Sequence, residues 1–386
     1  MDADVGIIGI GTMGSMAAWR LAKRGVKVLG FEQFAPGHDR SGAGGESRIF
    51  RTAYKEGVKY IPLLLRAREL WRELEADTGA ELLTLNGGLT IGVESAHGMT
   101  NVLESAEAFK LDHEILNPAQ VTKRYPVHRL DKDEIAFLDK AAGYLKPEFS
   151  VMTAALEAER LGATIHRYTT VRDIQTDSHG VTISSDNSSW RVGKLLITAG
   201  AWTRDLLVDS VDDHEIVRIV LAWYVPKRPE LFTPERFPIF MRVKGDDDFC
   251  GWPMVNGTSV KFGRNGSHGV IGNAADLDRN IPPAWMVQWR RILEQYVPDL
   301  HPHPVRIGAY MDGWTHSGDP VVSHHPKLKN TVCMYGFSGH GFKMAPSFGD
   351  IAADLVLDKT PVFDLSPFAV PRVVRESAVP RQIFVR

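Results

Sequence analysis

Several features that mark particular classes of protein are scarce or absent here. The chain has only two cysteines among 386 residues, Cys250 and Cys333, so we expect no disulfide framework and a reducing, cytoplasmic environment. No apolar run is long enough to span a bilayer, and no basic segment precedes the first apolar run as in a signal peptide. The net charge of −2 at pH 7 predicts no nucleic-acid or membrane partner.

The size and composition that are present indicate a globular protein with more than one domain. Hydrophobic residues make up 44% of the chain and charged residues 24%, as in ordinary folded proteins. A chain of 386 residues exceeds the size of one hydrophobic core, which predicts two domains.

The first 32 residues carry the most informative pattern. An apolar run over 5–8 enters Gly9-Ile10-Gly11-Thr12-Met13-Gly14, and a helical pattern follows from Ser15 to Lys23. A second apolar run, 26–31, ends at Glu32. Strand, glycine turn, helix, strand and acid in this order are typical of a dinucleotide site. The alternative is a glycine-rich turn in another kind of parallel α/β protein.

The glycines and the acid of that pattern each have a separate physical role. Gly9 permits a tight turn, Gly11 lets a pyrophosphate approach the backbone, and Gly14 lets the helix pack closely on the strand. The start of the helix offers free N–H groups to phosphates. Glu32 can accept hydrogen bonds from ribose hydroxyls.

The rest of the chain alternates between strand and helix patterns. The loop 36–58 is rich in glycine, and 215–315 reads as strand-rich and aromatic. Strands that end in glycine or small residues occur at 5–14, 195–201 and 332–341, far apart in the sequence. A nucleotide domain built from all three is discontinuous, which favours a flavin enzyme over a simple NAD dehydrogenase. Helices are expected at 62–76, 150–161 and 346–357, and further strands at 88–92, 163–166, 181–184, 189–192 and 332–336.

Five segments, in this order, resemble one family of flavoproteins. They are 9–14, 47–51, 197–202, 220–224 and 336–343, the last reading Gly-Phe-Ser-Gly-His-Gly-Phe-Lys. This set is similar to the monomeric sarcosine oxidase and N-methyltryptophan oxidase group of the D-amino-acid-oxidase-like FAD oxidoreductases, over nearly the whole chain. The resemblance implies an FAD enzyme that oxidises the C–N bond of a secondary amine and reduces O2 to hydrogen peroxide.

The resemblance also implies a fold and domain boundaries. We expect a mixed α/β protein with a Rossmann-like FAD-binding domain formed by 1–81, 150–214 and 318–370. A substrate domain on a mixed or antiparallel sheet would comprise 82–149 and 215–317. The tail, 371–386, has no assigned role.

Roles at the site follow from matching positions. Arg51 and Lys343 match the pair that holds the substrate carboxylate, which is physically sound because a carboxylate leaving water needs charge-assisted hydrogen bonds. Lys261 matches the lysine that promotes the reaction with O2, and Arg48 an arginine near the flavin ring. Tyr310 is a further expected substrate contact. The residues expected to bind FAD are Gly9, Gly11, Thr12, Met13, Gly14, Glu32, Gln33, Arg40, Arg48, Val171, Gly339, His340, Gly341 and Lys343, and no metal site is expected.

The chain also departs from that group. The group attaches FAD through a cysteine, but 306–314 contains none, so we predict non-covalent FAD. Ala43, Gly44 and Asn265 replace histidines. The small residues at 43, 44 and 250 predict a roomier cavity, suited to a bulky N-substituent such as a sugar amine, an aromatic N-methyl amino acid or an opine-like compound.

Three other functions stay open at this point. One is an FAD dehydrogenase that uses an acceptor other than O2, against which Lys261 argues. Another is a flavin-binding protein without turnover, and a simple NAD dehydrogenase is the least favoured. The sequence does not specify the amine, nor whether the protein is a monomer or a dimer.

Overall fold

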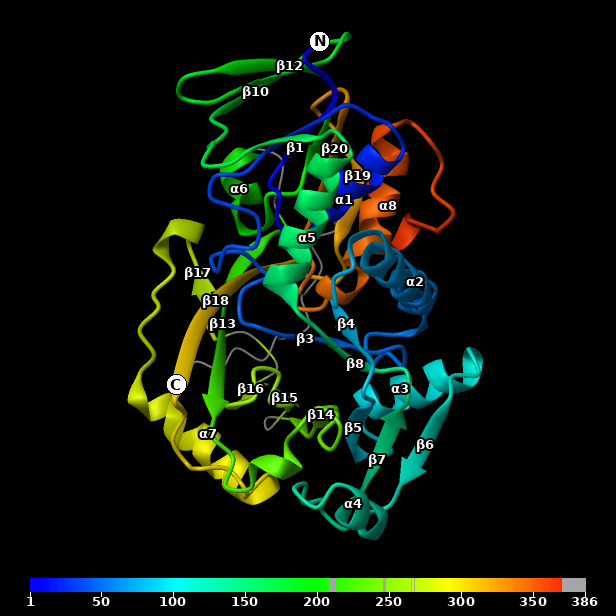
Figure 1. Ribbon diagram of the computed structural model, residues 1–386, viewed down its shortest axis with the longest axis vertical. Helices are drawn as coiled ribbons and strands as arrows, with labels where there is room; N and C mark the ends of the chain where they lie inside the picture. Colours follow the sequence, from blue (N-terminus) through cyan, green and yellow to red (C-terminus); the bar gives the residue numbers. More distant parts are fainter. Residues whose placement is uncertain (208–212, 246–247, 265, 267, 370–386) are drawn as a thin grey trace.

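Two large β-sheets, one above the other in Figure 1, organise the molecule. The computed structural model describes residues 1–207, 213–245, 248–264, 266 and 268–369. Asn265 and the tail 371–386, both considered above, lie outside the described residues. Within the described part, no helix is long and apolar enough to cross a membrane.

The upper sheet has parallel strands at its centre. β1 (Ala3–Ile8) lies between β12 (Ser189–Ile197) and β2 (Val28–Phe31), parallel to both. β12 pairs on its other side with two strands, antiparallel to β11 (Val181–Ser184) and parallel to β20 (Thr331–Tyr335). The remaining strands are β9 (Thr164–His166) beside β2, β10 (Asp173–Thr176) beside β11, and β19 (Val321–His324) beside β20. Three distant segments of chain thus form one sheet.

Helices cover this sheet and pack on one another. α1 (Thr12–Lys23) lies between α5 (Pro147–Arg160) and α8 (Ala345–Val356), and α2 (Ile61–Thr78) packs against α8 (Figure 1). The buried face of α1 includes Met16, Ala17 and Trp19, all with no exposed surface. A side chain at Gly349 would lie 2.7 Å from the backbone of Met16, so the glycine permits the close α1–α8 contact.

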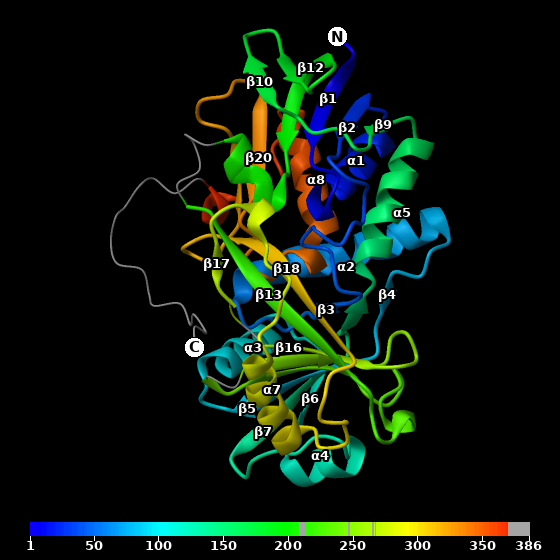
Figure 2. The same cartoon turned by 90° about the vertical axis from the view of Figure 1, so that its left-hand side faces the viewer.

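The lower sheet is mostly antiparallel, and two of its strands rise toward the upper one (Figure 2). β13 (Glu215–Tyr224) pairs along nearly its whole length with β18 (Arg306–Trp314). β16 (Val260–Arg264), β15 (Phe249–Trp252) and β14 (Ile239–Val243) continue the sheet. The other strands are β17 (Val270–Ile271), β5 (Gly88–Val93), β7 (Glu134–Asp139) and β6 (His113–Leu116).

Short elements complete the structure between and around the sheets. A small sheet joins β3 (Arg48–Phe50), β8 (Gly143–Leu145) and β4 (Leu83–Thr84). The remaining helices are α3 (His97–Ala108), α4 (Pro118–Arg124), α6 (Thr203–Leu206) and α7 (Pro283–Tyr296).

The mixed α/β class and the helices at α2, α5 and α8 agree with expectation, and three local predictions were wrong. The segments 189–192 and 195–197 belong to one strand, β12, because its two halves pair with different partners, and 198–201 lies beyond the end of this strand. The strand-rich region 215–315 contains the helix α7, whose Trp289, Ile292 and Leu293 pack on the lower sheet. The loop 36–58 contains the strand β3. The proposed domain boundaries stay a prediction.

Candidate functional site

A single elongated cavity of about 740 Å³ brings together most of the residues that the sequence singled out. It begins at the turn after β1 and passes β18 and the glycine turn after β20. Its other end lies among side chains of β3, β14 and β15. The cavity therefore joins the upper sheet to the lower one.

The N-terminal glycine turn forms the upper end of the cavity. Gly9 has φ +88°, and a side chain there would lie 2.6 Å from the Thr198 carbonyl oxygen. A side chain at Gly14 would lie 1.8 Å from the Gly9 carbonyl oxygen, which explains the tight contact between α1 and the turn. A side chain at Gly11 would meet no other part of the described chain within 4 Å of its Cβ. The backbone at the start of α1 is therefore open to a ligand.

Glu32 lies at the end of β2 and ties the turn together. Its carboxylate accepts hydrogen bonds from the backbone N–H of Ile10 (2.9 Å) and of Phe34 (3.0 Å). The side chain is 4% exposed and lines the cavity. Its oxygens retain lone pairs that a ribose hydroxyl can use.

The second glycine turn, 336–341, forms the middle of the cavity. Gly339 has φ +80°, which a larger residue adopts only with strain. His340 is held on both ring nitrogens, by the Tyr54 hydroxyl (3.1 Å) and by the Gly318 carbonyl oxygen (3.0 Å). Burial lowers the pKa of His340, so this ring acts as a neutral link between segments.

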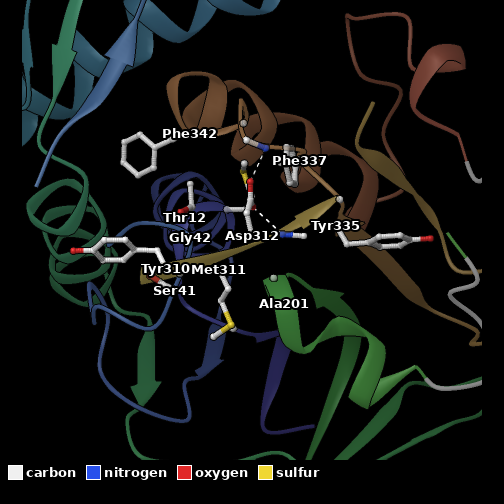
Figure 3. A pocket seen from close by; sticks show the side chains of 18 of the residues that line it. Thr12, Ser41, Gly42, Ala201, Tyr310, Met311, Asp312, Tyr335, Phe337 and Phe342 are labelled. Atoms are coloured by element: carbon white, nitrogen blue, oxygen red, sulfur yellow. Dashed lines mark hydrogen bonds between the residues drawn. The ribbon is translucent and has the colours of Figure 1, made fainter. Parts of the chain in front are cut away.

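Asp312, on β18, is a partly buried acid at this turn that sequence reasoning missed. Figure 3 shows its carboxylate in the cavity, bonded to two backbone N–H groups. They belong to Gly313 (2.9 Å) and Gly339 (2.5 Å). Burial raises the pKa of Asp312 to about 6. No motif marks this position, because only the tertiary fold brings β18 to the turn.

Two cations and an acid meet at the far end of the cavity. The Arg51 guanidinium is 5% exposed and donates from Nη2 to both oxygens of Glu56, at 2.8 and 3.1 Å. Its Nε and Nη1 are buried and make no hydrogen bond with any described residue. Lys343 is 6% exposed, and its Nζ donates to the His340 carbonyl oxygen (2.9 Å) and the Tyr54 hydroxyl (3.2 Å). Both cations line the cavity, and their role as carboxylate ligands stays a prediction.

The pKa shifts reflect this crowding of charge. Burial lowers the pKa of Lys343 to about 7, and the nearby charge of Arg51 acts in the same direction. Burial opposes ionisation of Glu56, but Arg51 and Lys55 outweigh it and bring its pKa to about 2. An anion entering this end would meet one permanent and one titrating cation.

Lys261, on β16, is buried beneath the loop that precedes β3. Its Nζ donates to the carbonyl oxygens of Gly45 (2.9 Å) and Ser47, and lies 3.8 Å from the centre of the Trp252 ring. Burial lowers its pKa well below the usual range, and the charge of Arg48 adds to this. The backbone of that loop is strained, since Glu46 has φ +76°.

Arg48, on β3, belongs to the same loop and lines the cavity. Its guanidinium donates to the carbonyl oxygens of Ser47 and Gly42, both at 2.8 Å, and of Gly44. Lys261 and Arg48 thus fix the loop from two sides.

The prediction of extra room beside residues 43 and 44 was wrong. A side chain at Gly44 would lie 2.8 Å from the ring of Tyr310. Ala43 is fully buried in the hydrophobic core that includes residues of α1. The absence of a side chain at Gly44 therefore accommodates Tyr310, which itself lines the cavity (Figure 3). Cys250 does line the cavity, as part of an apolar wall with Trp252.

Most of the other expected residues also line the cavity, and three do not. Gly14 permits close packing of α1 on the turn, and Lys261 lies behind the loop 45–47. The Arg40 guanidinium lies over the Phe34 ring, 4.7 Å from its centre. The cavity lining includes Gly9, Gly11, Thr12, Met13, Glu32, Gln33, Val171, Gly339, His340 and Gly341.

The shape and chemistry of the cavity fit FAD. Its upper end has an open backbone at a helix start and a carboxylate on the adjacent strand, which suit a pyrophosphate and a ribose. Its middle is formed by backbone of the glycine turn, where a flat ring can approach closely. The elongated space then continues to Arg51 and Lys343.

Comparison with known proteins agrees with this geometry. The family model described as FAD dependent oxidoreductase matches residues 4–355. A monomeric sarcosine oxidase of Streptomyces avermitilis is 34% identical, over 97% of this chain and 99% of that protein. An N-methyl-L-tryptophan oxidase of Salmonella agona is 32% identical, over 96% and 99%. The solved structure of NikD, an amino acid oxidase of nikkomycin biosynthesis, has a TM-score of 0.85 at 22% identity, over 97% and 99%, and shows the same fold.

Proposed function

Because this chain belongs to the family of FAD-dependent oxidoreductases, we propose that it oxidises a secondary amine that carries a carboxylate, with O2 as the electron acceptor. The observation that carries the proposal is the buried Arg51, whose Nε and Nη1 find no hydrogen-bond partner among the described residues, and which lines the cavity together with Lys343. A buried cation with free donors is costly unless an anion binds there. The names of the two similar oxidases support an N-substituted amino acid as the substrate.

The chain's own residues would bind and orient this substrate. Arg51 and Lys343 approach from β3 and from the glycine turn, so together they fix the direction of the carboxylate. FAD held along this cavity would supply the hydride acceptor: the carbon next to nitrogen would lose a hydride and the nitrogen a proton, and these two electrons and two protons would reduce O2 to hydrogen peroxide. Water then hydrolyses the imine to an amine and an aldehyde or oxo acid.

Lys261 would serve the half of the reaction that uses O2. Electrons added to O2 create negative charge, and a fixed cation in a buried place stabilises that charge strongly. The two carbonyl oxygens that accept from its Nζ favour the protonated form, against the effect of burial.

A peroxide assay across N-methyl, N-glycosyl and N-carboxyalkyl amino acids tests the proposed function. We expect peroxide in proportion to substrate consumed, with at least one class active. Flavin that bleaches with an amine under anaerobic conditions, but yields no peroxide in air, would indicate a dehydrogenase. A flavin that no amine bleaches would contradict the proposal.

Binding of simple carboxylates should weaken as the pH rises through about 7. The pKa of Lys343 is lowered to about 7, so its ammonium is present below that pH and lost above it. Loss of one charge-assisted hydrogen bond predicts an affinity lower by about tenfold or more at pH 9 than at pH 6. Propionate is a suitable probe because it has no amine to titrate, and the spectrum of the bound flavin reports binding.

The variant Lys343→Arg separates this cause from others. Arginine stays charged across the range, so the pH dependence should become flat. An unchanged pH dependence in this variant would show that another group titrates.

We further predict that FAD is bound without a covalent link. The strand β18 carries Tyr310 and Met311 in the cavity and no cysteine, and the two cysteines of the chain lie on β15 and β20. Burial raises the pKa of Cys250 to about 11 and that of Cys333 to about 12, so both thiols are poor nucleophiles. Acid precipitation should release all the yellow flavin into the supernatant; flavin that stays with the pellet would contradict this.

A further inference from the structure

Lys55 is a cavity residue to which no role has been given so far. It lies between β3 and the helix α2, one residue before Glu56. The Asn101 side chain of α3 donates to its carbonyl oxygen at 2.6 Å. A side chain at Gly98 would lie 3.8 Å from its Cβ, so α3 also packs against the start of the side chain. The backbone at Lys55 is thus held in place by α3.

Lys55 lines the same cavity as Arg51 and Lys343, and the charges of all three act on Glu56. Lys55 lines the cavity, and its charge lowers the pKa of Glu56, Cys250 and Lys343, which come from three separate segments. Among the described residues, no carboxylate lies within 4 Å of its Nζ. The neighbouring Lys59 differs, because its Nζ donates to Asp319 at 2.5 Å.

The charges at this end do not balance. Three cations, Arg51, Lys55 and Lys343, face one carboxylate, Glu56, which already bonds to Arg51. One substrate carboxylate held by Arg51 and Lys343 would leave the charge of Lys55 without a counter-ion. A partly buried cation gains most from an anion in the same water-poor space.

We propose that Lys55 binds a second carboxylate of the substrate, so that this enzyme prefers secondary amines with two carboxylates. The inference rests on the proposed function, because it assigns the substrate class of the same site. The space between the two carboxylates would lie along the apolar wall of Ile49, Met241 and Cys250, which suits a short carbon chain. The class includes N-carboxyalkyl amino acids and N-methyl derivatives of acidic amino acids.

The test compares substrates that differ only in the second charge. The first pair is N-methylglutamate and N-methylglutamine, and the second is N-(carboxymethyl)alanine and its carbamoylmethyl amide. We expect the dicarboxylate of at least one pair to have a kcat/KM higher by about tenfold or more. The preferred pair also tells whether the second carboxylate belongs to the side chain or to the N-substituent.

Variants at Lys55 show whether this residue causes the preference. In Lys55→Met the ratio within the preferred pair should fall close to one, because kcat/KM for the dicarboxylate falls much more than kcat/KM for the amide. Lys55→Arg should keep much of the preference. The matched control is Lys59→Met, which removes a positive charge four residues further along the chain and should leave the ratio unchanged.

A binding measurement gives the same answer without turnover. Succinate and succinamate are matched in shape and lack an amine, and the spectrum of the bound flavin reports their dissociation constants. The wild type should bind succinate about tenfold more tightly than succinamate. The variant Lys55→Met should bind the two ligands equally tightly. Equal binding of both ligands to the wild type would overturn the inference.

The outcomes separate this inference from the proposed function. If amides and dicarboxylates are oxidised equally well in both pairs, Lys55 has no such role, although the protein is still an amine oxidase. If no amine reduces the flavin, the proposed function itself fails.

Discussion

Replacing Lys261 with methionine will slow the reoxidation of the reduced enzyme by O2 by about 10²–10³-fold, the usual effect of removing one electrostatic donor. Methionine keeps the approximate length of the side chain but removes the charge that lies between the carbonyl oxygens of Gly45 and Ser47. The rate at which substrate reduces the flavin under anaerobic conditions should change little. Stopped-flow mixing of reduced enzyme with O2 measures the rate of reoxidation. Anaerobic mixing of oxidised enzyme with substrate measures the rate of reduction.

A control is needed because Lys261 also supports the loop before β3. Lys194→Met removes a lysine whose Nζ pairs with Asp358 at the surface, 2.8 Å away, and should leave both rates unchanged. If Lys261→Met altered both half-reactions equally, its effect would come from the shape of the loop. If it altered neither, the residue would have no part in the reaction with O2.

The second large effect is expected at Arg51. In Arg51→Met the substrate carboxylate loses its permanent cation, and breaking a buried, hydrogen-bonded charge pair costs about 2–5 kcal/mol. This corresponds to a loss in kcat/KM of between about 30-fold and several thousand-fold. Steady-state peroxide assays with the preferred substrate measure the loss.

Two further variants make this result specific. Arg51→Lys keeps the charge but not the forked geometry, so we expect a smaller loss than in Arg51→Met. Arg66→Gln removes an arginine on α2 that pairs with Glu69 and should leave kcat/KM unchanged. Full activity of Arg51→Met, with normal flavin content, would exclude Arg51 as the carboxylate ligand.

The sequence predicted the upper sheet better than the lower one. The turn after β1, the acid at the end of β2 and the last turn after β20 follow local rules of glycine and charge, so each could be located from a few residues. The helix α7 could not, because an aromatic-rich segment with prolines fits strand and helix equally until its apolar face meets the lower sheet. The double pairing of β12 depends on two partners from distant segments.

At the site, residues within motifs could be predicted and residues outside them could not. Arg48, Arg51, Lys261 and Lys343 belong to segments that resemble a known group. Asp312 has no such context, since its role depends on β18 passing beside Gly339. The error at Ala43 and Gly44 has the same origin, because only the fold shows that Tyr310 fills the space beside Gly44 and that Ala43 is buried in a hydrophobic core.

The packing of α8 on α1, and of β20 on β12, has a consequence for biosynthesis. The first glycine turn is made when synthesis begins, but Gly339 and Lys343 complete the cavity only near the end of the chain. While the ribosome still holds that last part, α1 lacks one of its two helical neighbours and β12 lacks its parallel partner. The cavity therefore stays incomplete until the segment 331–356 has joined the upper sheet. FAD bound along the cavity would then hold the first and the last parts of the described chain together.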